Sequence, residues 1–299
     1  LVVHRGPMSF SPRSVLPVLL LTPSCPAGPS TASFASDAAD DAPAAEERFP
    51  GGTWLPLQGA LRQHGVTVIA LVDGQPVKAA IDTGATTCTM SMAMAEQLGL
   101  GAAARASNSG ADFIDAHEVR ARGSFIGASL VVGPIAKDAQ RISVVPGDAD
   151  EMLIAVDVLG DWELFIVADE GLIGFFPPGA GPRRNDDSHV AGVLDRGGRV
   201  WVDTSTKGAR DFAKARLLID TGASTTTFPS ARAVDAGVPA DLRFRAITVG
   251  VHSEQQQRVR FLLDPLRLGS TDVGTVNAFE ELSGGGDAAG PAARRRPRR

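Results

Sequence analysis

The residues that form disulfides and bind metals are scarce in this sequence, which has two cysteines and five histidines in 299 residues. It has no tyrosine. The two cysteines, Cys25 and Cys88, are too few for a disulfide framework, and the histidines lack the close spacing of metal ligands. We therefore expect neither a metal nor any other cofactor. The formal net charge of -5 argues against a basic face, so no nucleic-acid partner is expected.

Glycine and proline are plentiful, with 33 and 20 residues, and valine, threonine and phenylalanine recur in short runs. This composition favours short strands joined by turns over long helices, and hence an all-β fold. The hydrophobic content of 43% is ordinary for a globular protein, and the length fits one large domain or two small ones.

The N-terminal region has the pattern of an export signal. Its apolar stretch at 15–21 is too short to cross a bilayer as a helix, but it suits the core of a signal peptide. Residues 21–25 resemble a loose bacterial lipobox, from which Pro23 departs, and this makes Cys25 a lipidation candidate. We expect an exported protein, either secreted or anchored to the membrane of the bacterial cell envelope through Cys25. The alternative is an unstructured leader.

Shifts in composition divide the chain into segments. A stretch rich in Ala, Ser, Pro and Asp follows the leader, a stretch rich in Gly, Pro and Arg interrupts the middle, and a basic stretch comes last. We predict a signal peptide or lipoprotein leader at 1–25, a flexible linker at 26–50, a first lobe at 51–180, an inter-lobe linker at 181–197, a second lobe with an incomplete pattern at 198–282 and a disordered basic tail at 283–299.

The second lobe partly repeats the first. Residues 81–90 (IDTGATTCTM) align without gaps to residues 219–228 (IDTGASTTTF). In each lobe an apolar strand leads into the repeat, and a short helix that ends at a glycine follows it. The expected strands are 66–72, 77–81, 200–202 and 212–219, with a loop at 203–211, and the expected helices are 92–98 and 230–236.

Each copy of the repeat carries Asp-Thr-Gly-Ala directly after its apolar strand. One Asp-Thr-Gly is an ordinary turn pattern, but two copies in matching contexts are hard to obtain by chance. Two close carboxylates cannot both ionise, so they share a proton; one can then activate a water while the other protonates a carbonyl oxygen. Asp82 and Asp220 are therefore the candidate catalytic pair for peptide hydrolysis.

On these two motifs the chain resembles the aspartic proteases of the retropepsin-like and pepsin-like clan. The resemblance implies an all-β, bilobal fold in which each Asp-Thr-Gly loop supplies one catalytic aspartate. It also implies the roles of the flanking residues: Thr83 and Thr221 tie the loops together, Gly84 and Gly222 let them turn tightly, and Ala85 and Ala223 take the fourth position.

The chain also departs from the pattern of this clan. Alanine at the fourth position of both motifs removes a hydroxyl that could lower a carboxylate pKa, so we expect a mildly acidic pH optimum. The lack of tyrosine rules out the flap tyrosine of pepsin-like enzymes and favours the retropepsin-like side. Residues 153–159 resemble the stretch that packs behind the catalytic loop, with Asp157 as a structural residue. The second lobe has no counterpart of this stretch.

We therefore predict an aspartic endopeptidase that acts on peptides or unfolded proteins as a monomer with an internal pseudo-dimer. Two alternatives remain: a non-catalytic, exported peptide-binding protein of the same fold, and a protease that is active only as a homodimer through Asp82. Cys88 is interpreted as a small buried residue and not as a nucleophile.

Overall fold

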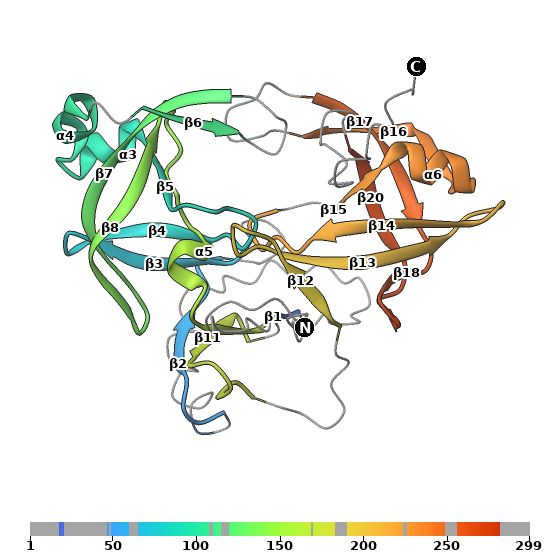
Figure 1. Ribbon diagram of the computed structural model, residues 1–299, viewed down its shortest axis with the longest axis horizontal. Coiled ribbons are helices and arrows are strands. Elements are labelled where there is room, and N and C mark those ends of the chain that lie inside the picture. Colours follow the sequence, from blue (N-terminus) through green and yellow to red (C-terminus); the bar gives the residue numbers. More distant parts are fainter. Residues whose placement is uncertain are drawn as a thin grey trace, which may run out of the picture.

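In a computed structural model the chain consists mainly of strands, which form four sheets among the described residues (Figure 1). The all-β fold expected from the composition is thereby confirmed. The structure describes residues 18–20, 47, 49–59, 65–107, 110–114, 120–168, 170–182, 190–223, 226–248 and 256–281.

The first lobe is built on a seven-stranded sheet. Its strands are β3 (Thr67–Val72), β4 (Gln75–Ile81), β5 (Thr89–Ser91), β6 (Ala111–Ile114), β7 (Arg120–Val132), β8 (Ile135–Val145) and β9 (Met152–Ile154). Their order in the sheet is β3-β4-β9-β5-β8-β7-β6. Because β4 pairs with β3 on one side and in parallel with β9 on the other, the strand that leads to Asp82 is central.

The second lobe divides its strands between two sheets. One contains β12 (Gly192–Leu194), β13 (Val200–Lys207), β14 (Phe212–Leu218), β18 (Leu266–Leu268) and β19 (Thr271–Asp272). The other contains β15 (Thr226–Pro229), β16 (Ala240–Thr248), β17 (Gln256–Leu263) and β20 (Val276–Glu281), in the order β15-β20-β17-β16. Asp220 follows β14, as Asp82 follows β4.

A further four-stranded sheet contains β1 (Val18–Leu20), β2 (Thr53–Pro56), β10 (Glu163–Val167) and β11 (Leu172–Phe176) in the order β1-β10-β11-β2. Aromatic rings hold it together: the Trp54 ring meets the rings of Phe165 and Phe176 edge-on, at centroid distances of 6.0 and 5.6 Å. β1 falls within the predicted leader and pairs in parallel with β10.

The helices are short: α3 (Met92–Gln97), α4 (Gly101–Ala106), α5 (Val156–Leu159) and α6 (Ser230–Ala236). The two helices predicted after the motifs are confirmed as α3 and α6. α3 begins where the Ser91 hydroxyl accepts the Met94 N–H at 3.0 Å, and α6 ends at Gly237, which has a left-handed φ of 72°.

The prediction of a loop at 203–211 is wrong for residues 203–207. β13 continues to Lys207 and pairs with β14 along its whole length. Its central residues alternate between buried and exposed, with Thr204 and Thr206 buried, because β-branched polar residues suit a half-buried strand as well as apolar ones do. The segment expected as the inter-lobe linker contains β12, which pairs with β13 and so forms part of the second-lobe sheet.

The two lobes share a pairing scheme up to a point. In the first lobe β5 pairs in parallel with β8, which pairs with β7; in the second lobe β15 pairs in parallel with β20, which pairs with β17. The first lobe then adds β9 and α5 behind its motif. Within the described residues, the second lobe has no element in that place, as the sequence led us to expect.

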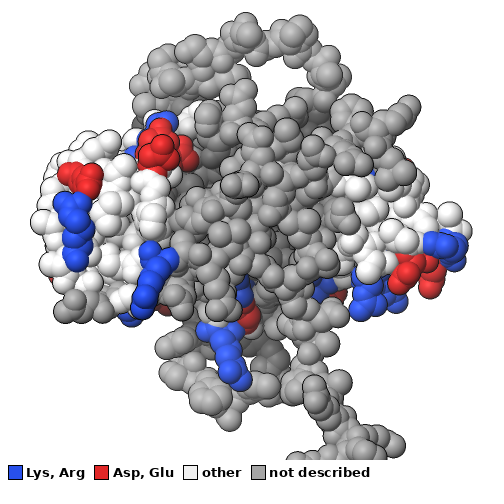
Figure 2. Space-filling model, turned by 90° about the horizontal axis from the view of Figure 1, so that it is seen from above, with Lys and Arg blue, Asp and Glu red and all other residues white. Residues whose placement is uncertain are grey.

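Charges of both signs lie side by side on the described surface seen from above (Figure 2). Exposed pairs such as Arg216 and Asp203, with an Nε–Oδ1 distance of 2.8 Å, contribute little to stability. Among the described helices, none has the length and apolar character needed to span a membrane.

Candidate active site

Asp82 is fixed at the end of β4 by its own loop and by β9. Its backbone N–H donates to the Ile154 carbonyl at 2.9 Å, which extends the pairing of β4 with β9 by one residue. Its carboxylate Oδ1 accepts the N–H groups of Gly84 at 2.9 Å and Ala85 at 2.8 Å. The loop therefore turns around the carboxylate and sets its orientation.

Asp220 takes the same place at the end of β14. The N–H of Ile219 donates to the Val200 carbonyl at 2.8 Å, as the corresponding residues of the first lobe also do. Asp220 Oδ1 accepts the Gly222 N–H at 2.8 Å. In both motifs, therefore, the aspartate Oδ1 accepts the N–H of the glycine two residues later.

Two threonines join the loops across the boundary between the lobes. The Thr83 N–H donates to Thr221 Oγ1 at 3.2 Å, and the Thr221 N–H donates to Thr83 Oγ1 at 3.1 Å. Each hydroxyl also donates to a carbonyl of the opposite lobe, Thr83 to Ile219 at 2.9 Å and Thr221 to Ile81. Because both threonines are buried, breaking these bonds would leave polar groups without partners or water.

Each motif glycine lies against the aspartate of the other lobe. An ideal Cβ on Gly84 would be 2.4 Å from the carboxyl carbon of Asp220, and one on Gly222 would be 2.7 Å from that of Asp82. Neither glycine is among the residues with positive φ. The requirement for glycine therefore comes from the close approach of the two loops and not from the tight turn that the resemblance implied.

Burial, together with the charge of Asp220, raises the pKa of Asp82 from 3.8 to about 7. A hydrogen bond between the two carboxyl groups acts in the same direction, whereas the N–H groups of Ala85 and Gly84 stabilise the charged form and lower the pKa. Asp82 therefore retains its proton toward neutral pH.

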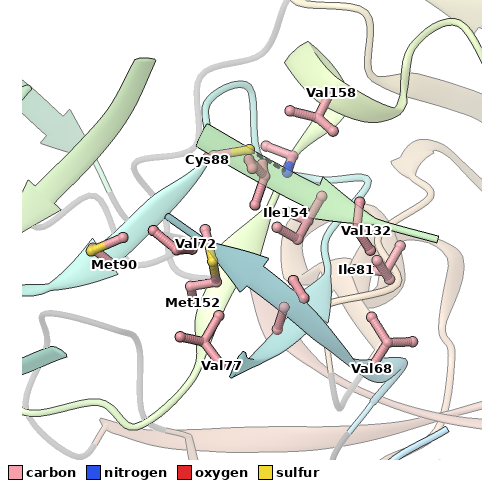
Figure 3. Packing of buried hydrophobic residues seen from close by; sticks show 14 of the residues in the cluster. Val68, Val72, Val77, Ile81, Cys88, Met90, Val132, Met152, Ile154 and Val158 are labelled. Atoms are coloured by element: carbon pink, nitrogen blue, oxygen red, sulfur yellow. Dashed lines mark hydrogen bonds between the residues drawn. The ribbon is translucent and has the colours of Figure 1, made fainter. Parts of the chain in front are cut away.

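A network behind the first loop went unrecognised in the sequence. The Asp157 carboxylate accepts the Cys88 N–H at 3.2 Å, the Cys88 thiol at 3.2 Å and the Gln140 side-chain amide at 2.8 Å. The Ala155 N–H in turn donates to Cys88 Sγ at 3.3 Å, the dashed contact in Figure 3, where Cys88 lies among buried aliphatic side chains. The spacing of Cys88 and Asp157 gives no sequence signal, since 69 residues separate them.

The titration of this network differs from that of free side chains. Burial and the neighbouring Asp157 carboxylate raise the pKa of the Cys88 thiol above its usual range, so Cys88 is a neutral donor and not a nucleophile. Burial also raises the pKa of Asp157, while the hydrogen bonds from Cys88 and Gln140 oppose that rise. Asp157 is structural, as the sequence indicated, and its contacts connect α5 to the strand after Asp82.

A turn of the second lobe packs beside the first loop. Asp195 Oδ1 accepts the N–H groups of Gly197 at 2.8 Å and Arg199 at 3.0 Å, and its Oδ2 accepts Trp201 Nε1 at 3.1 Å. An ideal Cβ on Gly197 would lie 2.6 Å from Thr86 Cγ2, so this turn touches the loop that carries Asp82. It lies within the segment expected as a linker.

Other predicted features lie outside the described residues. Cys25 is one of them. The sequence also offers two turn-like segments after the helices, 107–110 and 251–254, as candidate flap tips, and residues 108–109 and 251–254 of these lie outside the described residues. Within the described part of the chain, no group of three or more His, Cys, Asp or Glu side chains could hold a metal ion.

Residues 68–161 match the family described as "gag-polyprotein putative aspartyl protease". A solved retropepsin-like aspartic protease from Rickettsia conorii is 20% identical, with a TM-score of 0.33, over 43% of this chain and 93% of that chain. No curated protein matches. The family match lies in the lobe that carries Asp82 and confirms the resemblance to retropepsin-like aspartic proteases drawn from the motifs.

Proposed function

We propose that this chain is an aspartic endopeptidase that hydrolyses peptide bonds with a water activated between Asp82 and Asp220. The observation that carries the proposal is the crossed packing of the motifs, in which each aspartate carboxyl group lies against the glycine of the other loop. The raised pKa of Asp82, about 7, supports a pair that shares one proton. Such a pair has one group ready to accept a proton and one ready to donate it.

The reaction needs no covalent intermediate. The ionised carboxylate takes a proton from water as the water oxygen attacks the carbonyl carbon, and the protonated carboxyl group gives its proton to the carbonyl oxygen. The tetrahedral diol then breaks its C–N bond while the nitrogen receives a proton from the pair and a hydroxyl returns one. The carboxyl and amine products form, and the pair again holds a single proton.

The substrate class that suits this chemistry is a peptide or an unfolded protein. The proposed active unit is a single chain, and the hydrogen bonds between Thr83 and Thr221, which join the two lobes of one chain, support this proposal. The internal pseudo-dimer then provides both aspartates without a second copy.

The test is hydrolysis of an unfolded protein by the parent chain, by Asp82→Asn and by Asp220→Asn, with Asp148→Asn as an exposed control. Cleavage should be lost in both motif variants and kept in the control. A folded parent chain that cuts no unfolded protein at any pH from 4 to 8 would overturn the proposal and favour the non-catalytic peptide-binding protein. This second candidate is favoured by the second lobe, which has no counterpart of β9 and α5 among its described residues.

The Asp220 variant alone decides between a single-chain enzyme and a homodimer. If two first lobes paired through Asp82, Asp220→Asn would keep its activity and the activity per chain would fall on dilution. A single-chain enzyme loses activity in this variant and has the same specific activity at all chain concentrations.

The pH dependence tests the role of the alanines at the fourth position. Because the pKa of Asp82 is about 7, hydrolysis should persist at mildly acidic pH and decline through neutrality. The double substitution of Ala85 and Ala223 by serine adds hydroxyl donors, which stabilise the ionised carboxylates and should shift the whole pH–rate profile toward acid. A profile of the parent chain that keeps rising toward pH 3 contradicts this expectation.

A further inference from the structure

The strand that leads to Asp220 is less covered than its counterpart in the first lobe. At the end of β4, Ala79, Ala80 and Ile81 are buried, with exposures of 0%, 8% and 0%. The corresponding residues of the second lobe, Leu217, Leu218 and Ile219, are all apolar, and the two leucines are larger than the alanines, yet all three are only half-buried. Among the described residues, β14 pairs with β13 alone, and no described strand pairs with its other edge, which is called the open edge below.

The first lobe shows which segment covers this edge in the repeat. β9 pairs in parallel with β4 there, and Ile154 is opposite Ile81. The Val156 N–H donates to the Ala85 carbonyl at 3.2 Å, and the Asp157 carboxylate accepts the Cys88 N–H. In the second lobe, the positions of Ala85 and Cys88 are taken by Ala223 and Thr226.

A basic residue lies at the corresponding position of β4 and of β14. In the first lobe Lys78 on β4 forms an ion pair with Glu151, which directly precedes β9, at 3.9 Å. The residue at the position of Lys78 in the second lobe is Arg216, whose side chain is 54% exposed although it pairs with Asp203 of β13 at 2.8 Å. A segment that pairs with β14 in the same register would therefore place an acidic residue next to an arginine. Residues 282–299, which follow β20, contain one large apolar residue, Leu282, and do not carry this pattern.

We propose that the open edge of β14 beside Asp220 is a docking site for an extended segment of another polypeptide, which pairs in parallel with the strand. The segment has the chemistry of residues 151–157: an acidic residue, three apolar residues, a small residue, any residue and an aspartate. Main-chain hydrogen bonds provide affinity, while the acidic residue and the aspartate fix the register. The docked aspartate takes the N–H of Thr226 as Asp157 takes that of Cys88.

Docking fixes the loop of Asp220 as β9 and α5 fix the loop of Asp82. Its effect on hydrolysis rests on the proposed function, whereas the docking itself does not. A segment that orders this loop increases the rate, because small displacements of a catalytic group are costly.

Binding is measured with a fluorescein-labelled peptide of residues 150–161 and the Asp82→Asn chain, which prevents cleavage of the peptide. Fluorescence anisotropy should show saturable binding with one peptide per chain. Hydrogen exchange by mass spectrometry should show slower exchange at 212–219 and unchanged exchange at 75–81. Absence of saturable binding, or protection at 75–81 in place of 212–219, overturns the proposal.

Charge variants on β14 fix the site of binding. Arg216→Glu should lower the affinity for the peptide by about fivefold, and a peptide with Glu151→Lys should restore the affinity of this variant. Lys214→Glu is the matched control, since it makes the same change of net charge on an exposed residue of the same strand; it should change affinity little. Equal weakening by both variants would mean non-specific attraction. A peptide with Asp157→Ala should bind about tenfold more weakly.

The activity measurement separates this proposal from the proposed function. The unlabelled peptide should increase the rate at which the parent chain cuts an unfolded protein, and Arg216→Glu should reduce that increase. If the peptide binds at β14 but no mixture shows hydrolysis, the docking proposal stands and the proposed protease function is refuted. If the chain hydrolyses the unfolded protein but does not bind the peptide, the proposed protease function stands and the docking proposal is refuted.

Discussion

At Asp82 two opposing effects act on one carboxyl group. The N–H groups of Gly84 and Ala85 stabilise its charge, while burial and the nearby Asp220 destabilise it. The second effect is larger, because the pKa rises to about 7. The close approach of the two loops leaves room only for glycine at positions 84 and 222. It also brings the charge of Asp220 near Asp82, which contributes to the raised pKa.

Replacing either motif glycine by alanine should abolish the function of the pair. The added Cβ of Gly84→Ala meets the Asp220 carboxyl group, and that of Gly222→Ala meets Asp82, so the loops must separate. We expect hydrolysis to fall by about 100-fold or more, because a displacement near 1 Å can have that effect. Gly127→Ala is the control, since nothing lies within 4 Å of its Cβ position. Motif variants that are as active as this control would contradict the crossed packing.

Asp82→Asn should stabilise the protein at high pH and not at low pH. The folded-state pKa of Asp82 is raised from 3.8 to about 7, so its favourable contribution is present below pH 3.8 and is lost as the pH rises through 7. Asparagine has no charge to bury at any pH. The melting temperature of this variant should exceed that of the parent by a few degrees at pH 8 and match it at pH 4. Equal differences at the two pH values would refute the shift.

At the scale of elements, β9 and α5 distinguish the two lobes. In the first lobe they fill the space behind the motif with buried residues, and Asp157 connects them to β5 and β8 through Cys88 and Gln140. The thiol acts as a hydrogen-bond donor to a carboxylate, which allows the small residue to be polar and still completely buried.

Asp157→Ala should loosen the first loop. It leaves the Cys88 N–H without its acceptor in a buried place, which costs about 1–3 kcal/mol in the free energy of unfolding. Urea unfolding measures this loss, and the rate of hydrolysis should fall with it. Asp138→Ala, an exposed change on β8, provides the comparison. If both variants unfold at the same urea concentration, the network contributes nothing to stability.

Local patterns allowed the motif-bearing parts to be predicted, and contacts between distant residues limited the rest. The strands before Asp82 and Asp220 and the helices α3 and α6 follow from periodicity and from terminal glycines. The extension of β13 to Lys207 was missed because its residues show no apolar pattern, whereas pairing with β14 lets the β-branched Thr204 and Thr206 take buried strand positions. The link from Asp157 to Cys88 was missed because the fold brings together residues that no local pattern connects.

On the scale of the whole molecule, the lobes are joined where the chemistry takes place. The reciprocal hydrogen bonds of Thr83 and Thr221 are buried at the lobe boundary, and the turn at 195–199 adds a contact next to Thr86. The geometry of the aspartate pair and the association of the lobes therefore depend on the same few groups. A change that separates the lobes must also separate the carboxyl groups.

Thr221→Val tests this dependence. Valine keeps the shape of threonine but removes the hydroxyl that accepts the Thr83 N–H and donates to the Ile81 carbonyl, leaving two buried groups unpaired. Each lobe has its own hydrophobic core, so both should stay folded while the pair loses its alignment. We expect hydrolysis to fall by about 10- to 100-fold with an unchanged circular dichroism spectrum, and thermal unfolding should separate into two steps. Thr221→Ser retains the hydroxyl and should retain one cooperative transition and most of the activity. If valine and serine behave alike, the threonines do not hold the lobes together, and the contact at the 195–199 turn must do so.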